Sequence, residues 1–190
     1  MNKHTYLLKG FMTLLAITIF GFANSQTYCT TNYTSTGWTK IVNIKLAGSS
    51  VTLDNASSAC NGDEEFTTLS TVPDLAPGGN YVLEVGKGTC SGGWEFYAIA
   101  WIDYNQNSTF DAAEELGRVY YPTFSNTHTV NIPFTVNCNA VSGNTRLRVS
   151  VHENSYPGPC SNFTYGQAED YTVNIGSSSG LSSDFFLPDT

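Results

Sequence analysis

Short runs in which apolar and polar residues alternate recur along the chain and predict β-strands. Apolar side chains occupy every second position in 40–46 and again in 80–86, the period of a strand with one buried face. Segment 95–102 is almost continuously apolar, as expected of a strand covered on both faces. The other strand-like segments are 116–121, 128–136, 145–152 and 170–175.

Turn-forming residues separate these segments, for example the Gly, Pro and Asn clusters in 75–79 and 141–144. No stretch keeps helical spacing for three turns, although 110–116 has the composition of a single helical turn. Many short strands between turns predict an all-β fold. We expect an antiparallel β-sandwich of the jelly-roll or immunoglobulin-like kind, formed by a single domain.

The two ends of the chain differ from this β-rich part. Residues 1–25 contain two lysines, a short apolar run and small residues before Gln26, which predicts a secretory signal peptide. The apolar run is too short to favour the alternative, a membrane anchor. Residues 26–175 form the predicted domain. Residues 176–190 begin with a Gly/Ser-rich stretch and are predicted to be a linker, a truncated continuation or a weakly docked tail.

The net charge limits the classes of possible partner, and the cysteine content bears on the cellular compartment. Eight basic and sixteen acidic side chains give a formal net charge of −8, which argues against nucleic acid and anionic membranes as partners. An exported chain meets oxidising conditions, so its five cysteines are expected to form disulfides and to leave one thiol over. We therefore expect a secreted, extracellular protein that does not insert into a membrane once the signal is removed.

Residues 103–115 concentrate oxygen-bearing side chains directly after the apolar segment 95–102. Calcium prefers six to eight oxygen ligands, and the loop of helix–loop–helix calcium sites draws them from positions 1, 3, 5, 7, 9 and 12. Counted from the first aspartate, these positions hold Asp103, Asn105, Asn107, Thr109 (through its carbonyl), Asp111 and Glu114, with Glu115 as a replacement for or addition to Glu114. The spacing predicts one structural Ca²⁺. The alternative is a polar turn that binds nothing.

Position 6 of this loop departs from the pattern. Calcium loops place glycine there to allow a sharp turn, and this chain has Ser108. Serine adopts a left-handed backbone conformation only at a steric cost, and Asn107 beside it tolerates that conformation better. We therefore expect a looser loop with a lower affinity for calcium.

Four segments occur in an order that resembles a known family: 28–30, 101–116, 143–151 and 159–175. Together they resemble the GEVED domain, a β-sandwich module of secreted bacterial proteins, especially of the Bacteroidota, over about residues 28–175. The stretch that names the family stands here as Gly166-Gln167-Ala168-Glu169-Asp170. Its first glutamate is replaced by Gln167, so a role for that carboxylate does not carry over.

The resemblance implies an extracellular, non-catalytic module of the kind attached to peptidases, adhesins or sorting domains. It also implies a disulfide between Cys29 and Cys160, because both occupy cysteine positions of the family. Cys60 and Cys90 are the second expected pair, which leaves Cys138 unpaired.

The adjacent carboxylates Glu169 and Asp170 precede a strand and are expected to point to opposite faces of it. One of them would reach a metal as an accessory ligand, or an arginine, while the other would face water. Arg146 and Arg148 alternate with apolar residues and so share the face away from the core. An ion pair with these arginines is the structural alternative to metal binding.

Three classes of function remain open. The first is a calcium-binding module for adhesion or substrate targeting, whose partner is an extracellular protein or glycan. The second is a carbohydrate-binding module, for which the candidate aromatics are Trp38, Trp94, Tyr120, Tyr121, Tyr156 and Tyr165. Exposure of Trp94 would favour it. The third is an enzyme, which the sequence disfavours because it contains no GxSxG, HExxH or phosphate-binding motif.

Overall fold

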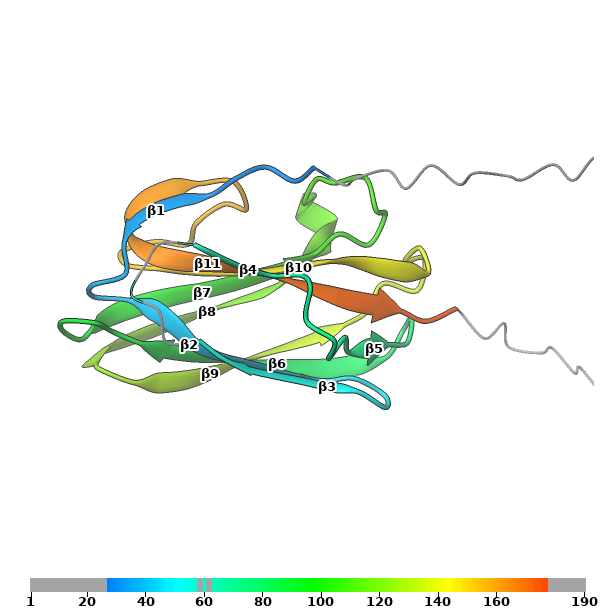
Figure 1. Ribbon diagram of the computed structural model, residues 1–190, viewed down its shortest axis with the longest axis horizontal. Coiled ribbons are helices and arrows are strands. Elements are labelled where there is room, and N and C mark those ends of the chain that lie inside the picture. Colours follow the sequence, from blue (N-terminus) through cyan, green and yellow to red (C-terminus); the bar gives the residue numbers. More distant parts are fainter. Residues whose placement is uncertain (1–26, 58–59, 61–62, 178–190) are drawn as a thin grey trace, which may run out of the picture.

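Two β-sheets packed face to face form the fold (Figure 1). The computed structural model describes residues 27–57, 60 and 63–177, so the predicted signal peptide and nearly all of the predicted tail lie outside the described residues. The strands are β1 (Asn32–Ser35), β2 (Lys40–Ala47), β3 (Thr52–Ala56), β4 (Glu64–Phe66), β5 (Asp74–Leu75), β6 (Asn80–Gly88), β7 (Trp94–Ile102), β8 (Glu115–Ser125), β9 (His128–Thr135), β10 (Gly143–His152) and β11 (Asn162–Ile175). A 3-10 turn, η1 (Ala112–Glu114), precedes β8.

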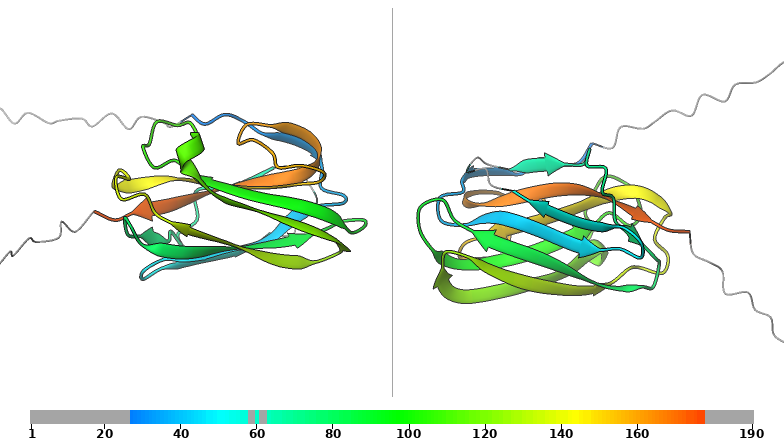
Figure 2. Two further views of the ribbon diagram at one scale, coloured as in Figure 1. Left: turned by 180° about the vertical axis from the view of Figure 1, so that it is seen from behind. Right: turned by 60° about the horizontal axis from the view of Figure 1, so that its bottom comes forward.

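The larger sheet has the order β1-β11-β10-β7-β8, and β4 and β5 also pair with β11. The smaller sheet has the order β3-β2-β6-β9 and comes forward in the right view of Figure 2. All pairs between the long strands are antiparallel, which confirms the predicted sandwich. The short strands β1, β4 and β5 add parallel pairs along the 14-residue strand β11.

Alternation along the strands places one apolar face of each sheet in the space between them. The side chains buried there include Phe96, Ala98, Ala100 and Ile102 from β7, Leu147, Val149 and Val151 from β10, and Leu83, Val85, Val130 and Ile132 from the smaller sheet. Burial of each Leu, Ile, Val or Phe side chain among these contributes roughly 1.5–3 kcal/mol.

A second apolar cluster covers the outer face of the larger sheet. Tyr28, Ile99, Trp101 and Phe110 are buried together there, on the side of the sheet where the loop with η1 lies in Figure 1. Strand β7 is therefore covered on both faces, which explains its nearly continuous apolar sequence.

Two disulfides fasten the segments that leave the sandwich. Cys29 pairs with Cys160 and Cys60 with Cys90, at Cα–Cα distances of 5.6 and 6.0 Å, while Cys138 is an exposed free thiol. The pairing expected from the family resemblance and the second expected pair are both confirmed.

The two disulfides are predicted to contribute unequally to stability. The Cys29–Cys160 bridge spans 131 positions and the Cys60–Cys90 bridge spans 30. In the chain-entropy model these loops correspond to about 5 and about 3.7 kcal/mol. Replacing Cys29 and Cys160 together by serine should therefore lower the free energy of unfolding in urea more than replacing Cys60 and Cys90. The reverse order, or a free Cys29 in non-reducing peptide maps, would contradict the assignment.

Candidate functional site

The loop after β7 is organised by Asp103, which is fully buried. Its carboxylate accepts hydrogen bonds from the Tyr28 hydroxyl at 2.6 Å and from the backbone N–H groups of Asn107 and Ser108 at 3.2 and 2.9 Å. The chain after β7 thus curls around the first predicted ligand. Asp103 is part of the fold as well as a candidate metal ligand.

The next candidates form a ladder of side-chain to backbone bonds within the same turn. The Asn105 side-chain oxygen accepts from the N–H of Asn107 at 3.0 Å, and that of Asn107 accepts from the N–H of Thr109 at 2.8 Å. Both asparagine amide groups also contact Asp111 Oδ2, at 3.2 and 3.4 Å. The structure therefore brings Asp103, Asn105, Asn107 and Asp111 into one turn, with Thr109 on its path.

The backbone makes the sharp turn even though the glycine is missing. Ser108 has φ +67° and Gln106 has φ +57°, so both adopt the left-handed conformation. Ser108 is the position at which calcium loops carry glycine. The left-handed conformation thus falls on Ser108 itself, whose N–H donates to Asp103, while the side chain of Asn107 accepts from Thr109.

The two glutamates at the end of the loop behave differently. Glu114 folds back into the turn, where its carboxylate accepts from the N–H groups of Asn105 and Asp111 at 3.1 and 2.9 Å. Burial raises the pKa of Glu114, and the charges of Asp103 and Asp111 raise it further. Both oxygens of Glu115 instead accept from Arg118, so the structure does not bring Glu115 to the other candidate ligands.

Carboxylates alone do not form a metal centre in the described part of the chain. No group of three His, Cys, Asp or Glu side chains there could hold a metal ion. The loop at 103–114 offers a different donor set, in which amide and carbonyl oxygens accompany the carboxylates. Calcium accepts such mixed oxygen ligands.

The strain at Ser108 gives a direct prediction. A non-glycine residue in the left-handed region costs roughly 1–2 kcal/mol. Replacement by glycine recovers only part of this energy, because glycine gives the unfolded chain more conformational freedom. We expect Ser108→Gly to raise the free energy of unfolding by about 1 kcal/mol, measured by urea denaturation. The matched change Ser142→Gly, in an exposed bend without positive φ, should lower it slightly. Equal effects of the two changes would contradict the strain argument.

The second candidate segment, Gly166–Asp170, begins where β11 passes close to its neighbours. Gly166 has φ +141°, and a Cβ atom there would lie 2.3 Å from the carbonyl oxygen of Val151 and 2.6 Å from the ring of Tyr33. Glycine is therefore required at this position by backbone conformation and by close packing.

The inward face of this segment connects the two sheets through buried polar groups. Gln167 Oε1 accepts from the N–H of Ile41 in β2 at 2.8 Å. Glu169 accepts from the hydroxyl of Ser57, just beyond β3, at 2.6 Å and from that of Tyr171. Glu169 is fully buried, so the expectation that one of the two carboxylates faces water is wrong.

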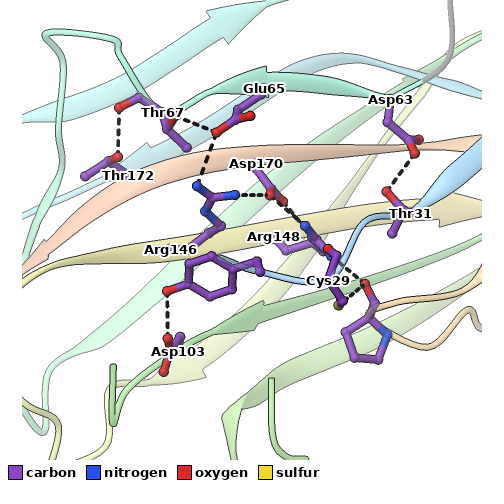
Figure 3. A network of polar contacts seen from close by, with 12 residues as sticks. Cys29, Thr31, Asp63, Glu65, Thr67, Asp103, Arg146, Arg148, Asp170 and Thr172 are labelled. Carbon is purple, nitrogen blue, oxygen red and sulfur yellow. Dashed lines mark hydrogen bonds and ion pairs between the residues drawn. The ribbon is translucent and has the colours of Figure 1, made fainter. Parts of the chain in front are cut away.

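On the outward face, Asp170 forms the predicted ion pairs with arginine (Figure 3). It accepts from Arg148 Nε and Nη2 at 2.6 and 2.7 Å and from Arg146 Nη1 at 2.8 Å. Arg146 Nη2 also reaches Glu65 at 3.2 Å. Of the two alternatives for the acidic pair, the structure forms the arginine pairing.

Tyr28 and Ser57 complete these sites, although neither was selected as a site residue from the sequence. Tyr28 lies 75 positions from Asp103, and Ser57 lies 112 positions from Glu169. A hydroxyl residue in a polar segment is common, so no local pattern marks these two as partners of buried carboxylates.

The buried Glu169 predicts a pH dependence of stability. Burial raises its pKa from 4.5 to about 7. Between these values the folded state binds more protons than the unfolded state, so the contribution of this group falls as the pH rises and is lost above about 7. Relative to Glu169→Gln, the wild-type free energy of unfolding should fall by roughly 3 kcal/mol from pH 4.5 to 7.

The control for this prediction is Val82→Ala, because Val82 is exposed and carries no ionisable group. Its stability should follow the wild-type pH profile. Parallel profiles for the wild type and Glu169→Gln would show that the carboxyl group does not titrate in this range.

Comparison with known proteins finds one protein family whose model covers both of these sites. The model of the GEVED domain family matches residues 97–174, a range that contains both the loop at 103–115 and the segment Gly166–Asp170. The resemblance to the GEVED domain family predicted from the sequence is thereby confirmed over these residues. Residues 28–96, which the prediction included, lie outside the match.

Other comparisons add little. No curated protein matches the chain. Among solved structures, the CARDB domain of the PF1109 protein from Pyrococcus furiosus, described as a complex with di-metal ions, is 12% identical and has a TM-score of 0.31, with coverage of 77% of this chain and 98% of that one. Within the residues described here, no helix is long and apolar enough to cross a membrane.

Proposed function

We propose that this protein is an extracellular, non-catalytic β-sandwich module for adhesion or substrate targeting, and that its loop 103–114 binds one structural Ca²⁺. The observation that carries the proposal is the oxygen-rich turn in which Ser108 adopts the left-handed conformation at the glycine position of calcium loops.

The donor chemistry of the loop fits a hard cation. The side-chain oxygens of Asn105 and Asn107 each carry two lone pairs, so each oxygen can bind a cation while it accepts a backbone N–H. Asp103 and Glu114 add carboxylate oxygens, and the carbonyl of Thr109 is the proposed backbone ligand. Bound calcium would also offset the mutual repulsion that raises the pKa of Glu114.

An extracellular location is supported by covalent chemistry. The chain has two disulfides. Disulfides form and persist in oxidising compartments and are rare in the cytosol. The predicted signal peptide at 1–25 points the same way.

The proposed absence of catalysis rests on the placement of the carboxylates. Glycoside hydrolysis needs two carboxyl groups facing each other across a substrate. Glu169 faces the interior between the sheets, whereas Asp103 bonds to Tyr28 in the cluster on the outer face. These two carboxylates cannot flank one substrate. We expect no hydrolysis of peptides, esters or glycans.

Calcium-dependent thermal melting tests the proposal. Binding to the folded state alone adds about 2.7 kcal/mol when free calcium is a hundred times the dissociation constant. The melting temperature of the wild type should rise by several degrees in calcium relative to chelator. Asp111→Asn should lose most of that rise and melt nearly unchanged in chelator, because Asp111 is exposed and contacts only the two asparagine amides and the η1 turn.

Glu115→Gln is the matched control, since Glu115 is paired with Arg118. It should keep the full calcium-dependent rise. If the wild type melts at the same temperature with and without calcium, the loop is a polar turn and the calcium part of the proposal is wrong.

A further inference from the structure

Three exposed aromatic side chains meet at the end of the sandwich opposite the loop at 103–114. Trp38, Trp94 and Phe124 are 40%, 36% and 63% exposed. The Trp38 and Trp94 ring centroids lie 6.0 Å apart with the rings nearly perpendicular, and those of Trp94 and Phe124 lie 4.8 Å apart. Such large exposed side chains in mutual contact mark a surface that takes part in binding.

Two glycines allow the connection between β6 and β7 to lie against this cluster. A Cβ atom on Gly92 would come within 2.8 Å of the Trp38 ring, and one on Gly93 within 2.8 Å of the side-chain oxygen of Asn126. The Trp38 ring therefore rests directly on the backbone at Gly92. The aromatic cluster is a packed arrangement and not a set of loose side chains.

A shallow recess of about 340 Å³ adjoins the rings, and its lining is polar but uncharged: Thr89, Cys90, Ser91, Gly92, Asn126 and Thr127. Cys90 is fastened to Cys60 by a disulfide. Thr89 and Ser91 donate to the carbonyl of Gly37. The side chains of Asn126 and Thr127 form no hydrogen bond with the described part of the chain, so their donors and acceptors remain available to a ligand.

The position of this aromatic end suits contact with a large partner. Trp94 begins β7 and Ile102 ends it, so roughly 26 Å of strand separates the aromatic end from the proposed calcium loop. In Figure 1 the start of the described chain and the end of β11 both lie on the side of η1, away from the aromatic end.

We propose that this end of the sandwich binds a neutral glycan. Flat aromatic rings stack on the C–H faces of sugar rings, and neighbouring amide and hydroxyl groups pair with sugar hydroxyls. The uncharged lining and the net charge of −8 disfavour polyanions and anionic lipid surfaces. The site goes beyond the proposed calcium function and does not depend on it.

Affinity electrophoresis of the full chain in gels that contain laminarin, galactomannan or xyloglucan tests the proposal. At least one of these neutral polysaccharides should retard the protein, and titration with that polysaccharide should change its tryptophan fluorescence. Phe124→Ala and Trp94→Ala should each weaken binding by about ten-fold or more. Gly92→Ala should weaken it as well, because the added methyl group displaces the Trp38 ring.

Two control variants distinguish glycan binding at the aromatic end from calcium binding and from a general loss of folding. Val82→Ala removes an apolar side chain with 46% exposure on the smaller sheet and should bind as the wild type does. Asp111→Asn should lose calcium-dependent stabilisation while keeping glycan binding. Melting temperatures of all variants show whether each remains folded, and Phe124, as the most exposed ring, is the safest to remove.

The proposal is overturned if folded wild-type protein is retarded by none of the three polysaccharides. It is also overturned if Phe124→Ala and Trp94→Ala, shown to be folded, bind as tightly as the wild type. Binding to phosphatidylcholine vesicles in place of the polysaccharides would assign the aromatic end to a lipid surface instead.

Discussion

The buried ion pair between Arg148 and Asp170 holds together the parts of the molecule that the sheets alone do not join. The two residues face each other across β10 and β11, and the guanidinium uses Nε and Nη2 for the carboxylate. Its remaining nitrogen, Nη1, donates to the carbonyls of Cys29 and Pro159. One side chain therefore fixes the first described segment, the last connection and the disulfide between them. Removing either partner of such a buried pair costs roughly 3–5 kcal/mol, because the other charge is left without compensation.

This arrangement gives a structural meaning to the Gly-Gln-Ala-Glu-Asp segment. Successive side chains of a strand point to opposite faces, so Gln167 and Glu169 reach the smaller sheet while Asp170 reaches the arginines. Gly166 permits the close passage of β11 beside Val151 and Tyr33. The segment thus joins the two sheets and the outer layer, and both of its carboxylates already form hydrogen bonds or ion pairs within the fold. The two ligand sites proposed above lie instead at the two ends of the sandwich.

The degree to which each site could be predicted follows from how local its interactions are. Apart from the bond between Asp103 and Tyr28, the turn at 103–114 is held by side-chain bonds between residues two to nine positions apart, and its members could be selected from their spacing alone. Spacing alone also selected Glu115, but its side chain binds Arg118 three positions later and does not join the other candidate ligands. The aromatic end could not be predicted from spacing at all. It combines Trp38 from the β1–β2 connection, Trp94 from β7 and Phe124 from β8, and Phe124 was not among the aromatics that the sequence singled out.

The sequence by itself determined the long strands and the sandwich, because alternation of apolar side chains specifies which face of a strand is buried. It also determined the acidic character and the position of the oxygen-rich turn. Only the tertiary structure decided that β1, β4 and β5 are strands, since two to four residues carry no readable period and gain their order from pairing with β11. The same holds for the burial of Glu169 and for the meeting of Trp38, Trp94 and Phe124. Each depends on segments far apart in the chain, whose contacts are set by the packing of the sheets and not by neighbouring residues.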